Sequence, residues 1–231
     1  MLCTERADIV LALDESTSIV ENNPNRDNWY KGMLGLATNI VRAFSISPDL
    51  TQIGVLTFSN SARVRFYLNR YRNSADVIAA ISRLKITLGD TNIADALRTA
   101  RTELFSSQNG ARRGVPKILV LIAAGPANIN VRMTIPEANT TKAAGIHIFT
   151  LGIGSQIKEE ELRTIATLRS YFYFATNVIT LTDVVHRLLN SSCGLADVTT
   201  TRFPPLPTTI TRPARPTTRP QFVTSPSTRG Q

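Results

Sequence analysis

Three oxygen-bearing side chains stand at alternate positions directly after an apolar run. Residues 7–13 are apolar apart from Asp8, and Asp14, Ser16 and Ser18 follow them. A carboxylate and two hydroxyls at this spacing can converge on one point from a loop that leaves a strand. Small, hard oxygens are the ligands that Mg²⁺ and Mn²⁺ prefer. The pattern therefore predicts a candidate site for a divalent cation.

A second polar segment, Gly89-Asp90-Thr91-Asn92, adds another hydroxyl. Thr91 stands at the start of an expected helix, where it would act as the N-cap. The same hydroxyl is suited to bind a cation, directly or through water, and the two roles can coexist. The candidate metal ligands are therefore Asp14, Ser16, Ser18 and Thr91.

Other kinds of chemistry find less support in the sequence. The Gly152-x-Gly154 pair lacks the third glycine of a dinucleotide-binding loop, and the chain contains neither a P-loop nor a Gly-x-Ser-x-Gly motif. A phosphatase-type nucleophile at Asp14 would need a second Asp where Ser16 stands. We expect that the chain is not an enzyme; a hydrolase is the alternative that a screen of esterase and phosphatase substrates would test.

Strand-like and helix-like segments alternate along the chain, and they must position these groups. This alternation is typical of an α/β fold, a doubly wound, Rossmann-like and mostly parallel sheet with helices on both faces. Apolar and basic side chains alternate over residues 62–68, which favours one antiparallel edge strand. The expected strands cover 7–13, 52–58, 62–68, 117–123, 146–151 and 171–175, and the expected helices cover 27–44, 75–84, 92–105, 132–144, 158–168 and 180–191.

In such a sheet, ligands bind beyond the carboxyl ends of the strands, where the strand order reverses. The loops to consider follow residues 13, 58, 123 and 151. We expect a binding face made of 14–18, 59–61, 89–92 and 124–128. Within it, the expected ligand-contacting residues are Glu15, Ser59, Asp90 and Asn92.

The net charge of +9 is spread along the chain. Residues 1–194 carry 21 basic and 16 acidic side chains, and residues 195–231 carry five Arg and one Asp. Nucleic-acid binding favours basic clusters interleaved with aromatic residues, and the sequence contains no such cluster. Two interpretations of this charge are therefore kept: a cationic surface that binds acidic polysaccharide or acidic protein, and a surface that is merely solvated. No apolar run approaches the 20 or so residues that a membrane span needs.

The composition changes after Gly194. Residues 195–231 hold seven of the twelve Pro and ten Thr, with few large apolar side chains. Such a stretch cannot build a core, so we expect a folded domain over 1–194 and a disordered Thr/Pro-rich linker or stalk over 195–231.

Several features suggest a secretory route. Cys3 and Cys193 bracket the expected domain, so we expect them to close it with a disulfide in an oxidising compartment; the alternative is two free thiols in a cytosolic protein. Asn139 and Asn190 lie in N-glycosylation sequons. The first residues lack the apolar core of a signal peptide, so a secreted protein would be represented here by a fragment or a processed form.

Five blocks of sequence together resemble the von Willebrand factor type A (vWA) domain. Their order and spacing match that family over roughly residues 5–192, which is more specific than any single motif. The resemblance extends to the domains of matrilins, matrix collagens and integrin α-subunits. The blocks are DIVLALDESTS at 8–18, IGVLTFS at 53–59, GDTNIADAL at 89–97, KILVLI at 117–122 and GIHIFTLGIG at 145–154.

The resemblance implies a metal-ion-dependent adhesion site. Asp14, Ser16, Ser18 and Thr91 match the family's ligands, but Ala124 stands where the family has a further Asp. Either Mg²⁺ or Mn²⁺ binds weakly until a partner's carboxylate completes its shell, or the site is degenerate and only structural. The implied function is extracellular adhesion to a matrix or cell-surface protein; the alternative is a metal-independent module for matrix assembly.

Overall fold

The computed structural model describes residues 6–20 and 27–175. A six-stranded sheet in the order β3-β2-β1-β4-β5-β6 runs through it. All neighbouring strands are parallel except β2 and β3, which form an antiparallel pair at one edge. The strands are β1 (Ala7–Asp14), β2 (Thr51–Phe58), β3 (Ala62–Phe66), β4 (Lys117–Ala123), β5 (Ile146–Ile153) and β6 (Phe172–Ala175).

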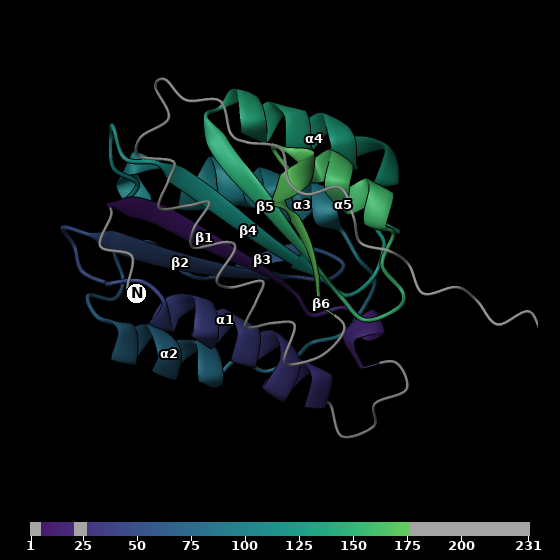
Figure 1. The fold of residues 1–231 in the computed structure, drawn as a ribbon, viewed down its shortest axis with the longest axis horizontal. Coiled ribbons are helices and arrows are strands. Elements are labelled where there is room, and N and C mark those ends of the chain that lie inside the picture. The colour runs from purple at the N-terminus through teal and green to yellow at the C-terminus, as the bar shows by residue number, and fades with distance from the viewer. Residues whose placement is uncertain (1–5, 21–26, 176–231) are drawn as a thin grey trace, which may run out of the picture. The chain divides into compact units, whose positions relative to one another are not determined.

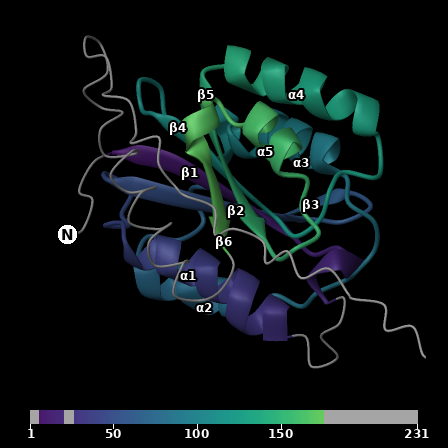
Figure 2. The ribbon, with the colours of Figure 1, turned by 45° about the vertical axis from the view of Figure 1, so that its right-hand side comes forward.

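Helices cover both faces of this sheet, as Figures 1 and 2 show. One face carries η2 (Asn28–Met33), α1 (Leu34–Arg42) and α2 (Ser74–Ser82). The other carries α3 (Ile93–Thr99), η3 (Ala100–Leu104), α4 (Val131–Ala143) and α5 (Glu159–Ile165). Three short 3₁₀ turns complete the described elements: η1 (Thr17–Ile19), η4 (Ser107–Asn109) and η5 (Arg169–Tyr171).

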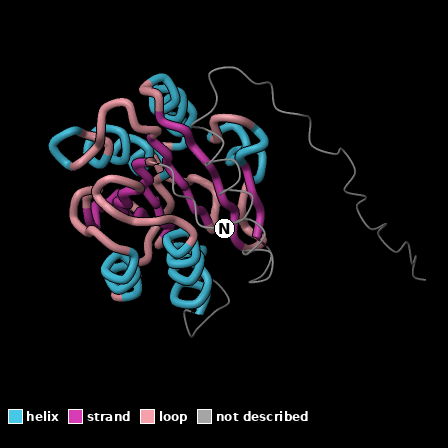
Figure 3. Tube along the Cα trace, turned by 60° about the vertical axis from the view of Figure 1, so that its left-hand side comes forward, coloured by secondary structure: helices cyan, strands magenta, loops and turns pink. Residues whose placement is uncertain are grey.

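The central strand β1 is buried along its whole length, and its successive side chains enter two separate cores. Ile9, Leu11 and Leu13 pack with the side chains of α1 and α2, whereas Val10 and Ala12 pack with those of α3 and α5. A strand covered on both faces has no solvent-exposed face, so its sequence is a continuous apolar run and does not alternate between apolar and polar residues. Figure 3 shows the resulting three layers, helix, sheet and helix.

The predicted α/β architecture is confirmed, including the antiparallel edge strand. The edge strand is shorter than predicted and ends at Phe66, and a register shift between Val55 and Leu56 interrupts its pairing with β2. The predicted strand over 146–151 extends to Ile153. Within the described residues, no helix is long and apolar enough to cross a membrane.

Several sequence predictions lie outside the described residues and stay predictions. They are the final helix over 180–191, the boundary at 194, the Thr/Pro-rich tail, the Cys3–Cys193 pair and the sequon at Asn190. The other sequon residue, Asn139, is described and exposed on α4.

Candidate functional site

Asp14 is the last residue of β1, and its carboxylate lies at the carboxyl end of the sheet with no exposed surface. Its Oδ1 accepts a hydrogen bond from the Ser16 backbone N–H at 2.8 Å, and its Oδ2 accepts one from the Ala124 N–H at 2.8 Å. Burial raises the pKa of this carboxyl, while the Ser16 hydroxyl and backbone N–H groups oppose the rise. A bound cation would favour the ionised form in the same way.

The Ser16 hydroxyl is buried beside Asp14 and has no hydrogen-bond partner within residues 6–20 and 27–175. It lies near enough to lower the pKa of Asp14, but its geometry falls short of a hydrogen bond. A buried hydroxyl without a hydrogen bond lowers the stability of the fold by roughly 1–3 kcal/mol, so such groups are rare and need a physical reason. A ligand at this point would provide one.

Gly125 leaves the space into which two further hydroxyls point. A Cβ on this glycine would stand 2.5 Å from Ser18 Oγ and 3.9 Å from Thr91 Oγ1. These two hydroxyls come from η1 and from the loop before α3, which are far apart in sequence. Asp14, Ser18 and Thr91 therefore lie against the loop that follows β4, and Ser16 lies beside Asp14.

The loop that carries Thr91 is held in place by two asparagine side chains. The Asn128 Oδ1 accepts from the Thr91 N–H at 2.6 Å, and its Nδ2 donates to Asp90 Oδ1 at 3.1 Å. The Asn60 Oδ1 accepts from the Asp90 N–H at 2.6 Å. Gly89 turns the chain with φ +122°, a conformation that favours glycine. These contacts fix the position of the Thr91 hydroxyl.

The structure places three of the four predicted ligand-contacting residues below the surface. Glu15 is fully buried, and its carboxylate accepts from Arg65 at 3.0 Å and from the Thr57 hydroxyl at 2.9 Å. Asn92 is the N-cap of α3, with its side chain accepting from the Asp95 N–H, so the predicted cap at Thr91 is wrong by one residue. Ser59 is buried as well, and Asp90 alone is exposed.

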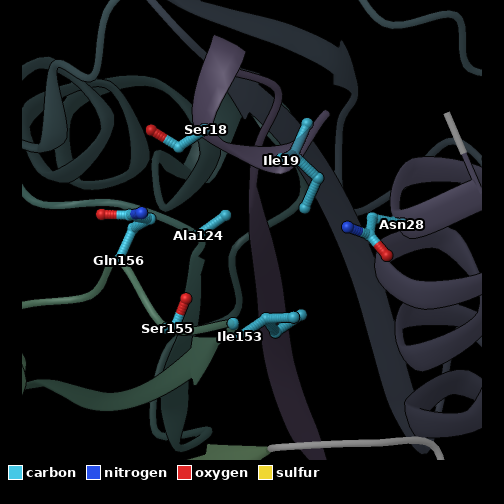
Figure 4. Close-up of a pocket in the computed structure, with 8 residues that line it drawn as sticks. Ser18, Ile19, Asn28, Ala124, Ile153, Ser155 and Gln156 are labelled. Carbon is cyan, nitrogen blue, oxygen red and sulfur yellow. The ribbon is translucent and has the colours of Figure 1, made fainter. Parts of the chain in front are cut away.

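A hollow of about 110 Å³ lies next to Ser18. Figure 4 shows it between η1, the end of β5 and the start of η2, with Ala124 at its wall. Its lining is half polar and free of charged side chains: Ser18, Ile19, Asn28, Ala124, Ile153, Gly154, Ser155 and Gln156. Ala124 is buried and forms part of the wall of this hollow.

Comparison with known sequences decides the family. The model of the von Willebrand factor type A domain matches residues 8–187. The chain belongs to the vWA family. That range contains every element of the described sheet except the first residue of β1.

The curated relatives of this vWA domain include matrix and adhesion proteins. It is 27% identical to integrin alpha-1 from Gallus gallus over 80% of the chain, and 26% identical to matrilin-1 from the same species over 80%. It is 29% identical to the collagen alpha-5(VI) chain of Mus musculus over 82%. The chain spans 66%, 36% and 7% of these relatives, respectively.

Solved structures of a matrix protein share the fold. Proximal thread matrix protein 1 from the mussel byssus superposes with a TM-score of 0.77 at 27% identity, over 83% of this chain and 49% of that one. A second structure of that protein, described as having a zinc-occupied MIDAS motif, gives 0.74 at 30% identity over 83% and 47%.

The residues of this vWA domain fit a hard cation in the type of their donor atoms. One carboxylate and two hydroxyls lie against the same loop, and a third hydroxyl, that of Ser16, is buried beside Asp14 with no partner among the described residues. They are short of negative charge, because Asp14 is the one carboxylate among these four residues. Among the described residues, no group of three His, Cys, Asp or Glu side chains could hold a metal ion.

Four further residues that shape the site were not predicted from the sequence. They are Asn60, Arg65, Gly125 and Asn128. Asn60 and Asn128 lie in segments that were assigned to the binding face, but single asparagines in loops carry no specific signal. The contact of Arg65 with Glu15 joins residues 50 apart, which no local pattern reveals.

Gly125→Ala should disrupt the site. The new Cβ would stand 2.5 Å from Ser18 Oγ and 2.9 Å from Ser18 Cβ, so Ser18 must move. We expect a loss of stability of about 1–3 kcal/mol and at least about a tenfold weaker Mg²⁺ affinity. Urea unfolding and calorimetric titration measure the two effects. Gly35→Ala, where a Cβ meets nothing within 4 Å, is the matched control and should change neither for the worse.

Proposed function

We propose that this vWA domain is an extracellular adhesion module that binds an acidic segment of a matrix or cell-surface protein at the carboxyl-end face of its sheet. The observation that carries the proposal is the buried, unpartnered Ser16 hydroxyl beside Asp14, with Ser18 and Thr91 around Gly125. The relatives from matrix and adhesion proteins support the biological setting.

The charge of the site supports an acidic partner. With Asp14 as the carboxylate among the four ligands, a divalent cation keeps a net positive charge there. A cation at this point would join the protein to a carboxylate of the partner. Asp14, Ser16, Ser18 and Thr91 would hold it, while Asn60 and Asn128 keep the Thr91 loop in place. Asp90, exposed at the rim, would set which partner residues approach.

Ser18→Ala tests the metal part of the proposal. Ser18 is half-buried. The hydrogen bonds of Asp14 come from the backbone N–H groups of Ser16 and Ala124, so removing the Ser18 hydroxyl leaves them intact. We expect calorimetric titration with Mg²⁺ or Mn²⁺ to show binding that weakens about tenfold in the variant. Ser107→Ala, an exposed serine in η4, is the control. Equal affinities in the two variants would contradict the metal site.

A metal-independent assembly module is the second candidate, and the replacement of the acidic ligand by Ala124 favours it. In that case the chain would associate with itself, and sedimentation would show the same oligomers in Mg²⁺ and in excess chelator. If binding to purified matrix proteins instead disappears in chelator and in Ser18→Ala, the adhesion site is supported and this candidate fails.

A further inference from the structure

The opposite end of the sheet carries an excess of exposed arginines. Five of them lie at the amino ends of the parallel strands or on the connections that join these ends to the helices. We call this set the amino-end basic surface: Arg6, Arg42, Arg70, Arg72 and Arg113. All five are exposed, and among the described residues none of them forms an ion pair.

Few carboxylates offset these charges. Asp8 is buried and already paired with Arg112 at 2.8 Å. Asp76, in the first turn of α2, accepts from the Asn73 side chain at 2.8 Å, and Asp49 is the remaining acid of the connections concerned. The five arginines thus keep their charge available to a partner, unlike the seven basic side chains (one lysine and six arginines) that form ion pairs elsewhere in the described chain.

The segments that carry these arginines touch one another. The Arg112 guanidinium donates to the Pro48 carbonyl at 2.9 Å and to the Leu50 carbonyl at 2.7 Å, which joins the loop before β2 to the loop before β4. Gly110 lies against Asn69, where an added Cβ would stand 2.7 Å from the Asn69 backbone N. The loop after β3 therefore belongs to the same surface.

The remaining link is between the two helices of one face. Arg42, at the end of α1, shares an open hollow with Ser74 and Ala75 at the start of α2, two residues beyond Arg72. The loops before β2, after β3 and before β4 thus form one continuous surface. Figure 1 shows these amino ends at the left, away from η1 at the carboxyl ends.

The two ends of the sheet differ in the number of exposed arginines. At the carboxyl end, the described connections carry three exposed basic side chains, Arg83, Lys85 and Lys158, and one exposed acid, Asp90, because Glu15 is buried against Arg65 and Asp27 pairs with Lys31. The amino end, with five exposed and unpaired arginines in the described chain, carries the larger cluster of available positive charge. Since the predicted binding face lies at the carboxyl end, the amino-end basic surface is separate from it.

The chemistry of this surface suits a polyanion with repeated charges. Arginine binds sulfate and carboxylate groups through paired N–H donors. An interface with a protein partner usually has an apolar core. The exposed large apolar side chains of the described chain, Tyr30, Val131, Met133 and Leu168, lie outside the three loops of this surface. A flexible sulfated chain can instead reach arginines on several loops without a shaped pocket.

We propose that the amino-end basic surface binds sulfated polysaccharide of the glycosaminoglycan type. The domain then has two contact surfaces at opposite ends of its sheet, one for an acidic protein segment and one for a sulfated chain. Such an arrangement links a protein and a polysaccharide through a single module. Because the two surfaces share no residue, the binding of the sulfated chain does not depend on the proposed metal site.

Binding of the full chain to immobilised heparin, measured at several salt concentrations, tests this inference. The test variant is the triple change Arg70→Gln, Arg72→Gln and Arg113→Gln. The control removes the same charge elsewhere, through Arg63→Gln, Arg83→Gln and Arg132→Gln, which are also exposed and unpaired among the described residues. A third variant changes Arg212, Arg215 and Arg219 to Gln, because the sequence after Gly194 is also basic.

We expect the test variant to bind heparin at least about tenfold more weakly and with a shallower dependence of affinity on salt, since fewer counterions are released. The control should change the affinity less than about twofold. Equal losses in test and control variants would overturn the proposal, as would a loss confined to the variant at 212–219. Polyglutamate that binds as tightly as heparin would assign the surface to acidic proteins instead, and unsulfated heparosan that does so would overturn the requirement for sulfate.

Discussion

Arg112→Ala should destabilise the domain by about 3–5 kcal/mol, because it leaves the buried Asp8 carboxylate without its counter-charge. Asp8 has no exposed surface, and Arg112 Nε donates to its Oδ1 at 2.8 Å. The same guanidinium donates to the carbonyls of Ala7, Pro48 and Leu50 at 2.7–2.9 Å. The substitution thus removes one ion pair and leaves three carbonyls without this donor. A loss of this size is a large part of the total stability of a domain, about 5–15 kcal/mol.

Urea unfolding measures this effect, and the neighbouring residue provides the control. Arg113→Ala removes an equal charge from an exposed side chain that pairs with nothing in the described chain, so it should change the stability by less than about 0.5 kcal/mol. Asp8→Asn in the Arg112→Ala background should recover part of the loss, because the buried charge is then gone. If Arg112→Ala costs no more than Arg113→Ala, the ion pair does not stabilise the fold.

This ion pair illustrates which parts of the fold the sequence predicts. The buried strands are visible as continuous apolar runs, because parallel strands in this layer arrangement have no wet face. In the run at 7–13, Asp8 stands out as the polar exception, but its partner lies 104 residues away. Local pattern thus finds the strand, while the contact that neutralises its charged residue depends on the tertiary fold.

The same distinction between local pattern and tertiary contact applies to the candidate site. The placement of Asp14, Ser16 and Ser18 at the binding edge could be predicted because strand ends meet at one edge of the sheet, whereas Thr91 lies between α2 and α3, so its approach to them depends on the tertiary fold. The burial of Glu15 could not be predicted, because it depends on the β2–β3 register that brings Arg65 to Thr57. The amide contacts of Asn60 and Asn128 connect loops 30 to 38 residues apart, so they too are set by the fold alone.

Glu15 shows why a residue inside a candidate metal-binding motif need not contact the ligand. It stands between Asp14 and Ser16, yet its carboxylate is held by Arg65 Nη2 and the Thr57 hydroxyl beneath the surface. That anchoring ties the loop after β1 to the β2–β3 pair. Glu15 therefore positions its two neighbours, and a direct role in ligand contact would require the ion pair with Arg65 to open.

Ala124→Asp should raise the affinity for Mg²⁺ about tenfold to a hundredfold, which corresponds to about 1.4–2.7 kcal/mol. The backbone N–H of Ala124 already donates to Asp14 Oδ2 at 2.8 Å, and its methyl group lines the hollow beside Ser18. A carboxylate at this position, beside the hollow, would add the negative charge that the four ligands lack. The affinity of oxygen sites for divalent cations depends on the number of charged ligands.

The same variant makes a second, independent prediction about stability. Without a cation, two neighbouring carboxylates repel each other at a buried site, so Ala124→Asp should unfold at lower temperature than the parent chain. Added Mg²⁺ should recover the loss and raise the unfolding temperature further, because a ligand that binds only the folded state stabilises it. Calorimetric titration and thermal unfolding in Mg²⁺ and in chelator measure both effects.

Ala124→Asn separates charge from shape in this experiment. It is nearly isosteric with Ala124→Asp but carries no charge, so it should leave the Mg²⁺ affinity within about threefold of the parent value and show little dependence of stability on Mg²⁺. Combining Ser18→Ala with Ala124→Asp should remove most of the gain if the new carboxylate acts at the predicted ligands. Equal behaviour of the Asp and Asn variants would mean that missing charge does not limit this site, and the structural interpretation of the Asp14 loop would then be favoured.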